Sequence, residues 1–147
     1  MRLLKGKSGA LRFSPHLDSI NFYKIVDFIA QNGYPSDKLL GEKNYQHECV
    51  RSAITAVLLH TPHMLVNNEN YLDFFLSEVD KGNMKRSTLA LILDKYYVIR
   101  RDENGNRKLL YGSQFGYPCL KYQKESDSAR ARIGLPPLSD SLFIQCN

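Results

Sequence analysis

Apolar residues recur at helical spacing along this sequence, and a glycine or a proline follows each run. The first run occupies positions i, i+3, i+4 and i+7 and consists of Phe22, Ile25, Val26 and Ile29. This is the pattern of an α-helix with one apolar face. Gly33 follows the run, and glycine accepts the left-handed conformation that ends many helices. The spacing therefore predicts a helix over residues 19–32.

Two more helices are predicted from the same kind of pattern. The second spans about residues 45–60, and Pro62 prevents its extension because proline cannot continue a helix. The third is capped by Asn67 or Asn68 and ends at Gly82. Its apolar stripe consists of Tyr71, Leu72, Phe75, Leu76 and Val79.

The pattern changes in the following segment. A fourth helix is predicted to begin near Ser87, but residues 96–101 are rich in aromatic and β-branched side chains, which favour a strand. Residues 102–105 read Asp-Glu-Asn-Gly, a turn sequence that accepts positive φ. Residues 107–111 are then predicted to return as the second strand of a β-hairpin.

A short C-terminal helix over residues 127–133, capped by Ser126 and ended by Gly134, completes the prediction. The predicted fold class is α+β and mostly helical, with about four helices, one β-hairpin and the short C-terminal helix. A chain of 147 residues fits one domain. We therefore expect a basic, flexible N-terminal arm over residues 1–13 and a single globular domain over residues 14–147.

The net charge of +5 is concentrated in the arm. The bases in residues 1–12 are Arg2, Lys5, Lys7 and Arg12, with no acid among them, whereas acids and bases nearly balance in the remainder. A solvated or vector-derived end is favoured over an arm that contacts phosphates. Nucleic acid is therefore expected to bind, if at all, only through this arm.

Neither a membrane span nor a secretory leader is predicted, since no apolar run approaches the ~18 residues of a spanning helix. The expected location is cytoplasmic. Cys49, Cys119 and Cys146 have neither CxxC nor metal-ligand spacing, so free thiols are favoured over a disulfide framework. For Cys49, a buried structural role is favoured over a nucleophile.

Several short motifs occur in order along residues 31–138. They are Gly33-Tyr34-Pro35, Gly41, His60 at a helix end, Asp94-Lys95, Leu110-Tyr111-Gly112-Ser113-Gln114, and Arg130 before Gly134-Leu135-Pro136-Pro137-Leu138. This order resembles a bacterial domain family of unknown function with the pattern G-[WY]-P, a glycine, Q-H, D-R-V, Q-x-Y-G-T-Q and R-R-x-x-[VI]-G-L. The sequence departs from that pattern at Leu59, Lys95 and Ala129, where the family has glutamine, arginine and arginine.

The candidate catalytic residues are His60 and Asp94. His60 is a general-base candidate because imidazole exchanges a proton near neutrality, and the alternative is a histidine that bonds the last carbonyls of its helix. Asp94 is a candidate to orient His60, accept a proton or bind a cation. Its alternative is a salt bridge with Lys95, Arg100 or Arg130.

The candidate ligand-binding residues are Tyr111, Gln114 and Arg130. A phenol and an amide both donate and accept hydrogen bonds, and a guanidinium offers a planar fork to a carboxylate or phosphate. The sequence contains no cofactor fingerprint and no metal-ligand spacing, so neither a cofactor nor a metal is expected. Two functions remain open: a hydrolase or transferase acting on a polar or anionic small molecule, and a non-catalytic module that senses a ligand or binds a protein partner. Either function predicts that the five residues share one pocket.

Overall fold

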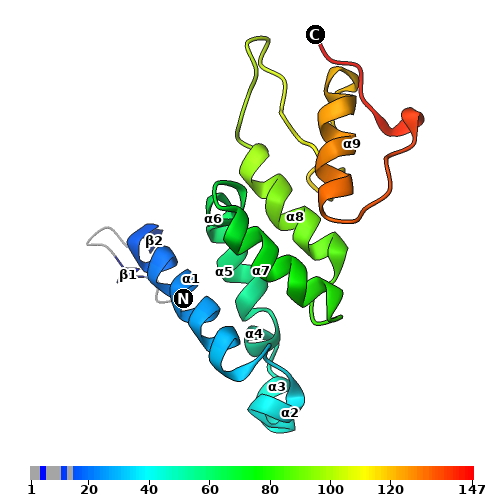
Figure 1. Cartoon of the computed structure of the whole chain (residues 1–147). Helices are drawn as coiled ribbons and strands as arrows, with labels where there is room; N and C mark the ends of the chain where they lie inside the picture. The colour runs from blue at the N-terminus through cyan, green and yellow to red at the C-terminus, as the bar shows by residue number, and fades with distance from the viewer. Residues whose placement is uncertain (1–3, 6–10, 13–14) are drawn as a thin grey trace. The chain divides into compact units, whose positions relative to one another are not determined.

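The computed structural model describes residues 4–5, 11–12 and 15–147. In this part of the chain it has nine α-helices, two short 3-10 helices and two strands of two residues each (Figure 1). The contacts within the chain define two compact units, Met1–Thr61 and Pro62–Asn147, and each is described by itself. Whether residues 14–147 act as one domain stays a prediction.

The first unit is built on two helices that pack together, α1 (Pro15–Asn32) and α5 (Ala53–His60). Their buried side chains include Phe22 and Ile29 from α1 and Ile54 and Leu58 from α5. The helix predicted over residues 19–32 is confirmed, although it begins earlier, at Pro15, and Gly33 follows it with φ +87°.

The helix predicted over residues 45–60 is divided into shorter pieces. These are α3 (Glu42–Tyr45), α4 (Glu48–Arg51) and α5, preceded by α2 (Asp37–Leu40). Ser52 separates α4 from α5, and its hydroxyl donates a hydrogen bond to the Glu48 carbonyl. The same carbonyl also accepts a hydrogen bond from the Ser52 N–H, and a serine hydroxyl that bonds the carbonyl four residues earlier weakens and bends a helix.

Two short strands are described in the N-terminal arm. β1 (Leu4–Lys5) pairs antiparallel with β2 (Leu11–Arg12). The rest of the predicted arm, residues 1–3, 6–10 and 13, lies outside the described residues.

The second unit begins with three helices in mutual contact, α6 (Pro62–Val66), α7 (Glu69–Asp80) and α8 (Arg86–Tyr97). The Asn68 side chain caps α7 by accepting a hydrogen bond from the Asn70 amide, which confirms the predicted third helix and its cap. Buried side chains of α7 and α8 include Phe75, Leu89, Ile92 and Leu93. A long connection then leads through η1 (Leu120–Tyr122) to α9 (Gln123–Arg132), and η2 (Asp140–Leu142) follows.

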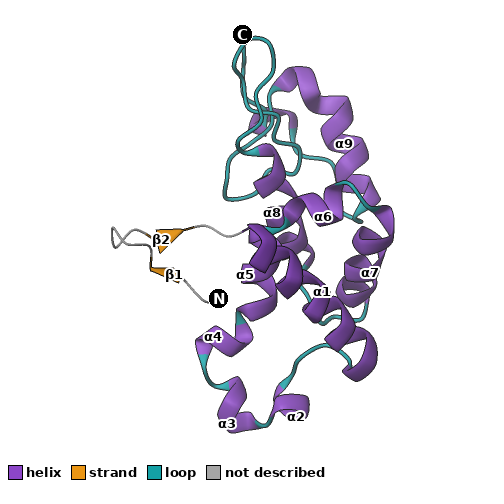
Figure 2. Ribbon diagram, turned by 90° about the vertical axis from the view of Figure 1, so that its left-hand side faces the viewer, coloured by secondary structure: helices purple, strands orange, loops and turns teal. Residues whose placement is uncertain are grey.

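The predicted β-hairpin is wrong. Helix α8 continues through Tyr97, and the predicted turn carries one isolated bridge, Arg101 to Arg107. Figure 2 shows this connection as loop rather than strand. Among the described residues only β1 and β2 are strands, so the α+β fold class is wrong and the fold is helical. The physical reason is that side chains, described below, bind the backbone groups that a hairpin partner would otherwise take.

The predicted free thiols at Cys119 and Cys146 are also wrong, because these two residues form a disulfide. Cys49 is a free thiol, but it is exposed rather than buried. Helix α9 begins before the predicted residue 127, so Ser126 lies within it and does not cap it. The Ser126 hydroxyl instead donates a hydrogen bond to the Leu110 carbonyl at 2.6 Å.

Candidate functional site

Asp94 is the centre of a hydrogen-bonded cluster in the second unit. It lies near the end of α8, and its side chain is fully buried. Oδ1 accepts hydrogen bonds from the backbone N–H groups of Leu110 and Tyr111, both at 3.0 Å, and Oδ2 accepts one from Ser113 at 3.1 Å. A buried carboxylate requires such partners. Asp94 therefore fixes the backbone of residues 110–113.

Arg130 holds the same segment from α9. Its guanidinium donates one hydrogen bond to the Tyr111 carbonyl and another, from Nε, to the Pro136 carbonyl at 2.7 Å. The side chain is only 8% exposed, and burial lowers its pKa from the ordinary value while Asp94 opposes this shift. These donors are directed at backbone carbonyls rather than at an open site.

Tyr111 lies between these two anchors. It is buried, and burial raises the pKa of its phenol well above the ordinary value, with Tyr97 and Asp94 adding to the effect. Burial disfavours the charged phenolate, so the side chain packs in its neutral form. Tyr111 is therefore part of the packed interior of this unit.

A pocket of about 480 Å³ opens beside this segment. We call it the α8 pocket, and its lining residues are Ser87, Thr88, Leu91, Gly112, Ser113, Gln114 and Tyr117. The first three come from the beginning and middle of α8. The next three follow Tyr111 directly, and Tyr117 lies three residues beyond them. Its polar groups are four hydroxyls and one amide, and no charged side chain lines it.

Gly112 shapes the wall of the α8 pocket. Its φ is +65°, a conformation that side chains with a Cβ atom rarely adopt. A Cβ atom at this position would also lie 2.9 Å from Leu138 Cδ1 and 3.2 Å from Tyr117 Cδ1. Glycine therefore permits both the turn after Tyr111 and the close packing of Tyr117 against it.

His60 lies in the first unit, at the end of α5. Its Nδ1 is 3.9 Å from Asp18 Oδ2 of α1, and the imidazole is 37% exposed. The other four predicted site residues belong to the second unit, so a pocket shared by all five stays a prediction.

The five predicted residues therefore fall into three groups. Asp94, Tyr111 and Arg130 come together around the backbone of residues 110–113, Gln114 lines the α8 pocket, and His60 belongs to the other unit. Sequence reasoning missed Ser87, Thr88, Leu91 and Tyr117. The first three lie at i, i+1 and i+4, a spacing that places them on one side of a helix, and this was the available signal.

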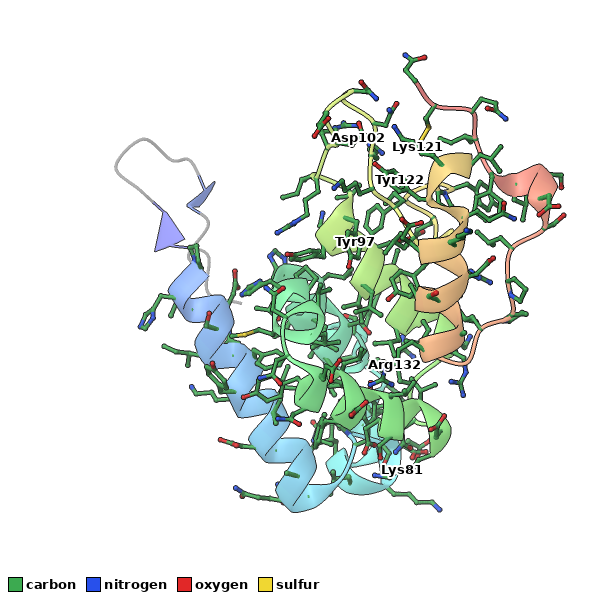
Figure 3. The ribbon with its side chains drawn as sticks, turned by 45° about the horizontal axis from the view of Figure 1, so that its top comes forward. Lys81, Tyr97, Asp102, Lys121, Tyr122 and Arg132 are labelled. Atoms are coloured by element: carbon green, nitrogen blue, oxygen red, sulfur yellow. A yellow bond between two sulfur atoms is a disulfide. The ribbon has the colours of Figure 1, made fainter. Side chains whose placement is uncertain are left out.

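A second polar cluster surrounds Asp102 in the connection after α8 (Figure 3). Lys121 Nζ lies 2.5 Å from one carboxylate oxygen, and the Tyr122 hydroxyl donates to the same oxygen at 2.7 Å. The hydrogen bond from Lys121, followed by that from Tyr122, holds the pKa of Asp102 well below its usual range. Burial, then the hydrogen bond to Asp102, raises the pKa of Tyr122 to about 12.

Within the described part of the chain, no three His, Cys, Asp or Glu side chains are grouped as a metal ion would require. Over the same residues, no helix combines the length and the apolar character that crossing a bilayer demands. Comparison with family models, curated proteins and solved structures found no match to this chain. The resemblance to the bacterial domain family therefore stays a prediction.

Proposed function

We propose that residues 62–147 form a non-catalytic module that binds a polar small molecule in the α8 pocket. The observation that carries this proposal is the chemistry of the lining, with hydroxyl and amide groups beside Leu91 and the Tyr117 ring. Small-molecule sites combine a few placed polar groups with apolar contact surface. The volume of about 480 Å³ lies within the range of about 300–1,000 Å³ for such sites.

Binding is favoured over catalysis because Asp94 and Arg130, the charged candidates of the second unit, are already engaged. Asp94 accepts three backbone hydrogen bonds, and Arg130 donates to two carbonyls. A general base must reach the proton that it removes, and neither group lines the pocket. The proposal thus assigns Asp94 and Arg130 to positioning the pocket wall.

A thermal-shift screen of the full chain against a metabolite library tests the proposal. A ligand of the α8 pocket should stabilise the wild type, and Gln114→Ala should reduce that shift. Gln145→Ala is the matched control, since Gln145 is also an exposed glutamine of the second unit but does not line the pocket. Mass spectrometry should recover the ligand unchanged after incubation. Recovery of a reaction product would overturn the non-catalytic assignment, and a screen without any Gln114-dependent ligand would overturn the binding site.

We also propose that the folded chain resides in an oxidising compartment, in place of the cytoplasmic location expected from the sequence. The Cys119–Cys146 disulfide supports this, because disulfides are rare where glutathione and thioredoxin keep thiols reduced. Thiol alkylation before lysis of the producing cells, followed by mass spectrometry, should find Cys119 and Cys146 unlabelled. Labelling of both would place the chain in a reducing compartment.

A further inference from the structure

The polar groups of the α8 pocket are all uncharged. The hydroxyls belong to Ser87, Thr88, Ser113 and Tyr117, and the amide belongs to Gln114. A hydroxyl both donates and accepts, and an amide offers separate donor and acceptor atoms. Such a set matches a ligand whose own groups also donate and accept, as alcohols do.

The charged side chain next to the lining residues of α8, Arg86, is already paired. The Arg86 guanidinium at the start of α8 donates to the Ile133 carbonyl and binds Asp80 at 2.9 Å, while Asp94 and Arg130 hold backbone groups. An ionised ligand would leave water without meeting an opposite charge from the lining side chains. Desolvating a charge without such a partner is costly, so the lining disfavours ionised ligands.

Tyr117 adds a surface of a different kind. Its side chain lines the pocket and is 41% exposed, and the glycine at position 112 allows its ring to pack against the turn. An aromatic ring presents an apolar face and, in tyrosine, a polar edge. A ligand with both C–H faces and hydroxyl groups would use the ring and the surrounding donors together.

We infer that the α8 pocket binds a neutral polyhydroxylated ligand, namely a carbohydrate. This inference rests on the proposed function, because it names the ligand class of the same pocket. Tyr117 is assigned the stacking surface, and Ser113 and Gln114 are assigned hydrogen bonds to sugar hydroxyls. The start of α8 lies at the same pocket, and its helix dipole would favour an anion. The test therefore includes anions as the competing class of ligand.

The test is a titration of the ¹⁵N-labelled full chain followed by NMR. The neutral probes are maltotriose, cellotriose and triacetylchitotriose, and the anionic probes are inorganic phosphate and citrate. At least one neutral probe should saturably shift the Gly112 amide and the Gln114 side-chain signals. An aromatic contact contributes at most about a factor of ten in affinity, so Tyr117→Ala should weaken binding of that probe by up to about tenfold. Tyr23→Ala is the matched control, since Tyr23 is a comparably exposed tyrosine of the first unit, and it should leave the affinity unchanged.

The outcomes separate the inference from the proposed function. If phosphate or citrate shifts these signals and the sugars do not, the carbohydrate assignment is overturned while a ligand pocket remains. Gln114-dependent, salt-sensitive binding of a charged metabolite from the library would likewise overturn the carbohydrate assignment and leave the ligand pocket in place. If no probe and no library compound affects the pocket, both proposals fail. If Tyr117→Ala and Tyr23→Ala changed the affinity for a sugar equally, that sugar would bind outside the α8 pocket.

Discussion

Replacement of Asp94 by asparagine tests the claim that this carboxylate fixes the wall of the α8 pocket. The asparagine Oδ1 can still accept the Leu110 and Tyr111 amides, but its Nδ2 group would face the Ser113 N–H, which then has no acceptor. A buried unsatisfied donor costs about 1–3 kcal/mol. Losing the charge from the two remaining bonds removes about 1 kcal/mol in total, since charge-assisted bonds are the stronger class.

The expected loss in the free energy of unfolding is therefore about 2–4 kcal/mol for Asp94→Asn. Asp94→Ala leaves all three amides without an acceptor and should cost more, about 4–6 kcal/mol. Asp80→Asn is the matched control, because the Asp80 carboxylate is 63% exposed and pairs with Arg86 at the surface. Exposed pairs contribute about 0–1 kcal/mol, so the control should change little.

Urea unfolding followed by circular dichroism measures these differences. With a slope of about 2 kcal/mol per molar urea, the middle of the usual range, the Asp94→Asn midpoint should fall by about 1–2 M. Hydrogen exchange reports the same change locally, because the Leu110, Tyr111 and Ser113 amides should lose their protection before the helical core does. Equal midpoints for Asp94→Asn and Asp80→Asn, with the three amides still protected, would refute the reasoning.

Three further predictions follow from other contacts. The Cys119–Cys146 disulfide spans 27 residues, so Cys146→Ser should lower the free energy of unfolding by about 3–4 kcal/mol in the loop-entropy account. Urea unfolding measures this loss, and Cys49→Ser is the control. Equal losses in the two variants would contradict the prediction. Because the folded pKa of Tyr122 is raised to about 12, its stabilisation is complete below about pH 10 and is lost as pH rises toward the folded value. The stability of Tyr122→Phe should thus fall less steeply with rising pH than that of the wild type, as measured by an alkaline titration followed by circular dichroism. Parallel curves for the two proteins would count against this prediction. Gly112→Ala should cost about 1–2 kcal/mol, because positive φ and close contacts with Leu138 and Tyr117 disfavour a Cβ atom. Unchanged thermal unfolding would show that the turn relaxes freely.

The sequence predicted those elements that local rules determine. The helix over residues 19–32, the Asn68 cap and the helix beginning near Ser87 are confirmed by α1, α7 and α8. Apolar spacing, caps and helix-ending residues act over three or four positions, so they can be read without knowledge of the fold. The same rules predicted a turn at residues 102–105, and Gly105 there has φ +81°.

The predicted strands failed because β structure depends on partners distant in the sequence. Aromatic and β-branched residues fit a pleated surface, but they do not determine whether a second strand is available. Here the first predicted strand begins inside α8. In the second predicted strand, the Asp94 and Ser126 side chains form hydrogen bonds with the Leu110 backbone N–H and carbonyl. Disulfide pairing across 27 residues likewise could not be deduced from spacing.

The candidate site divides along the same line. The sequence by itself identified Asp94, Tyr111, Gln114 and Arg130 as chemically capable, because residue type determines what a side chain can donate or accept. Only the tertiary structure decided how that capacity is used: Asp94 and Arg130 are directed at backbone groups, Tyr111 is buried, and Gln114 faces an open pocket with Ser87 and Thr88. The physical reason is that burial and competing partners, which arise from packing between distant segments, determine whether a polar group remains accessible to a ligand.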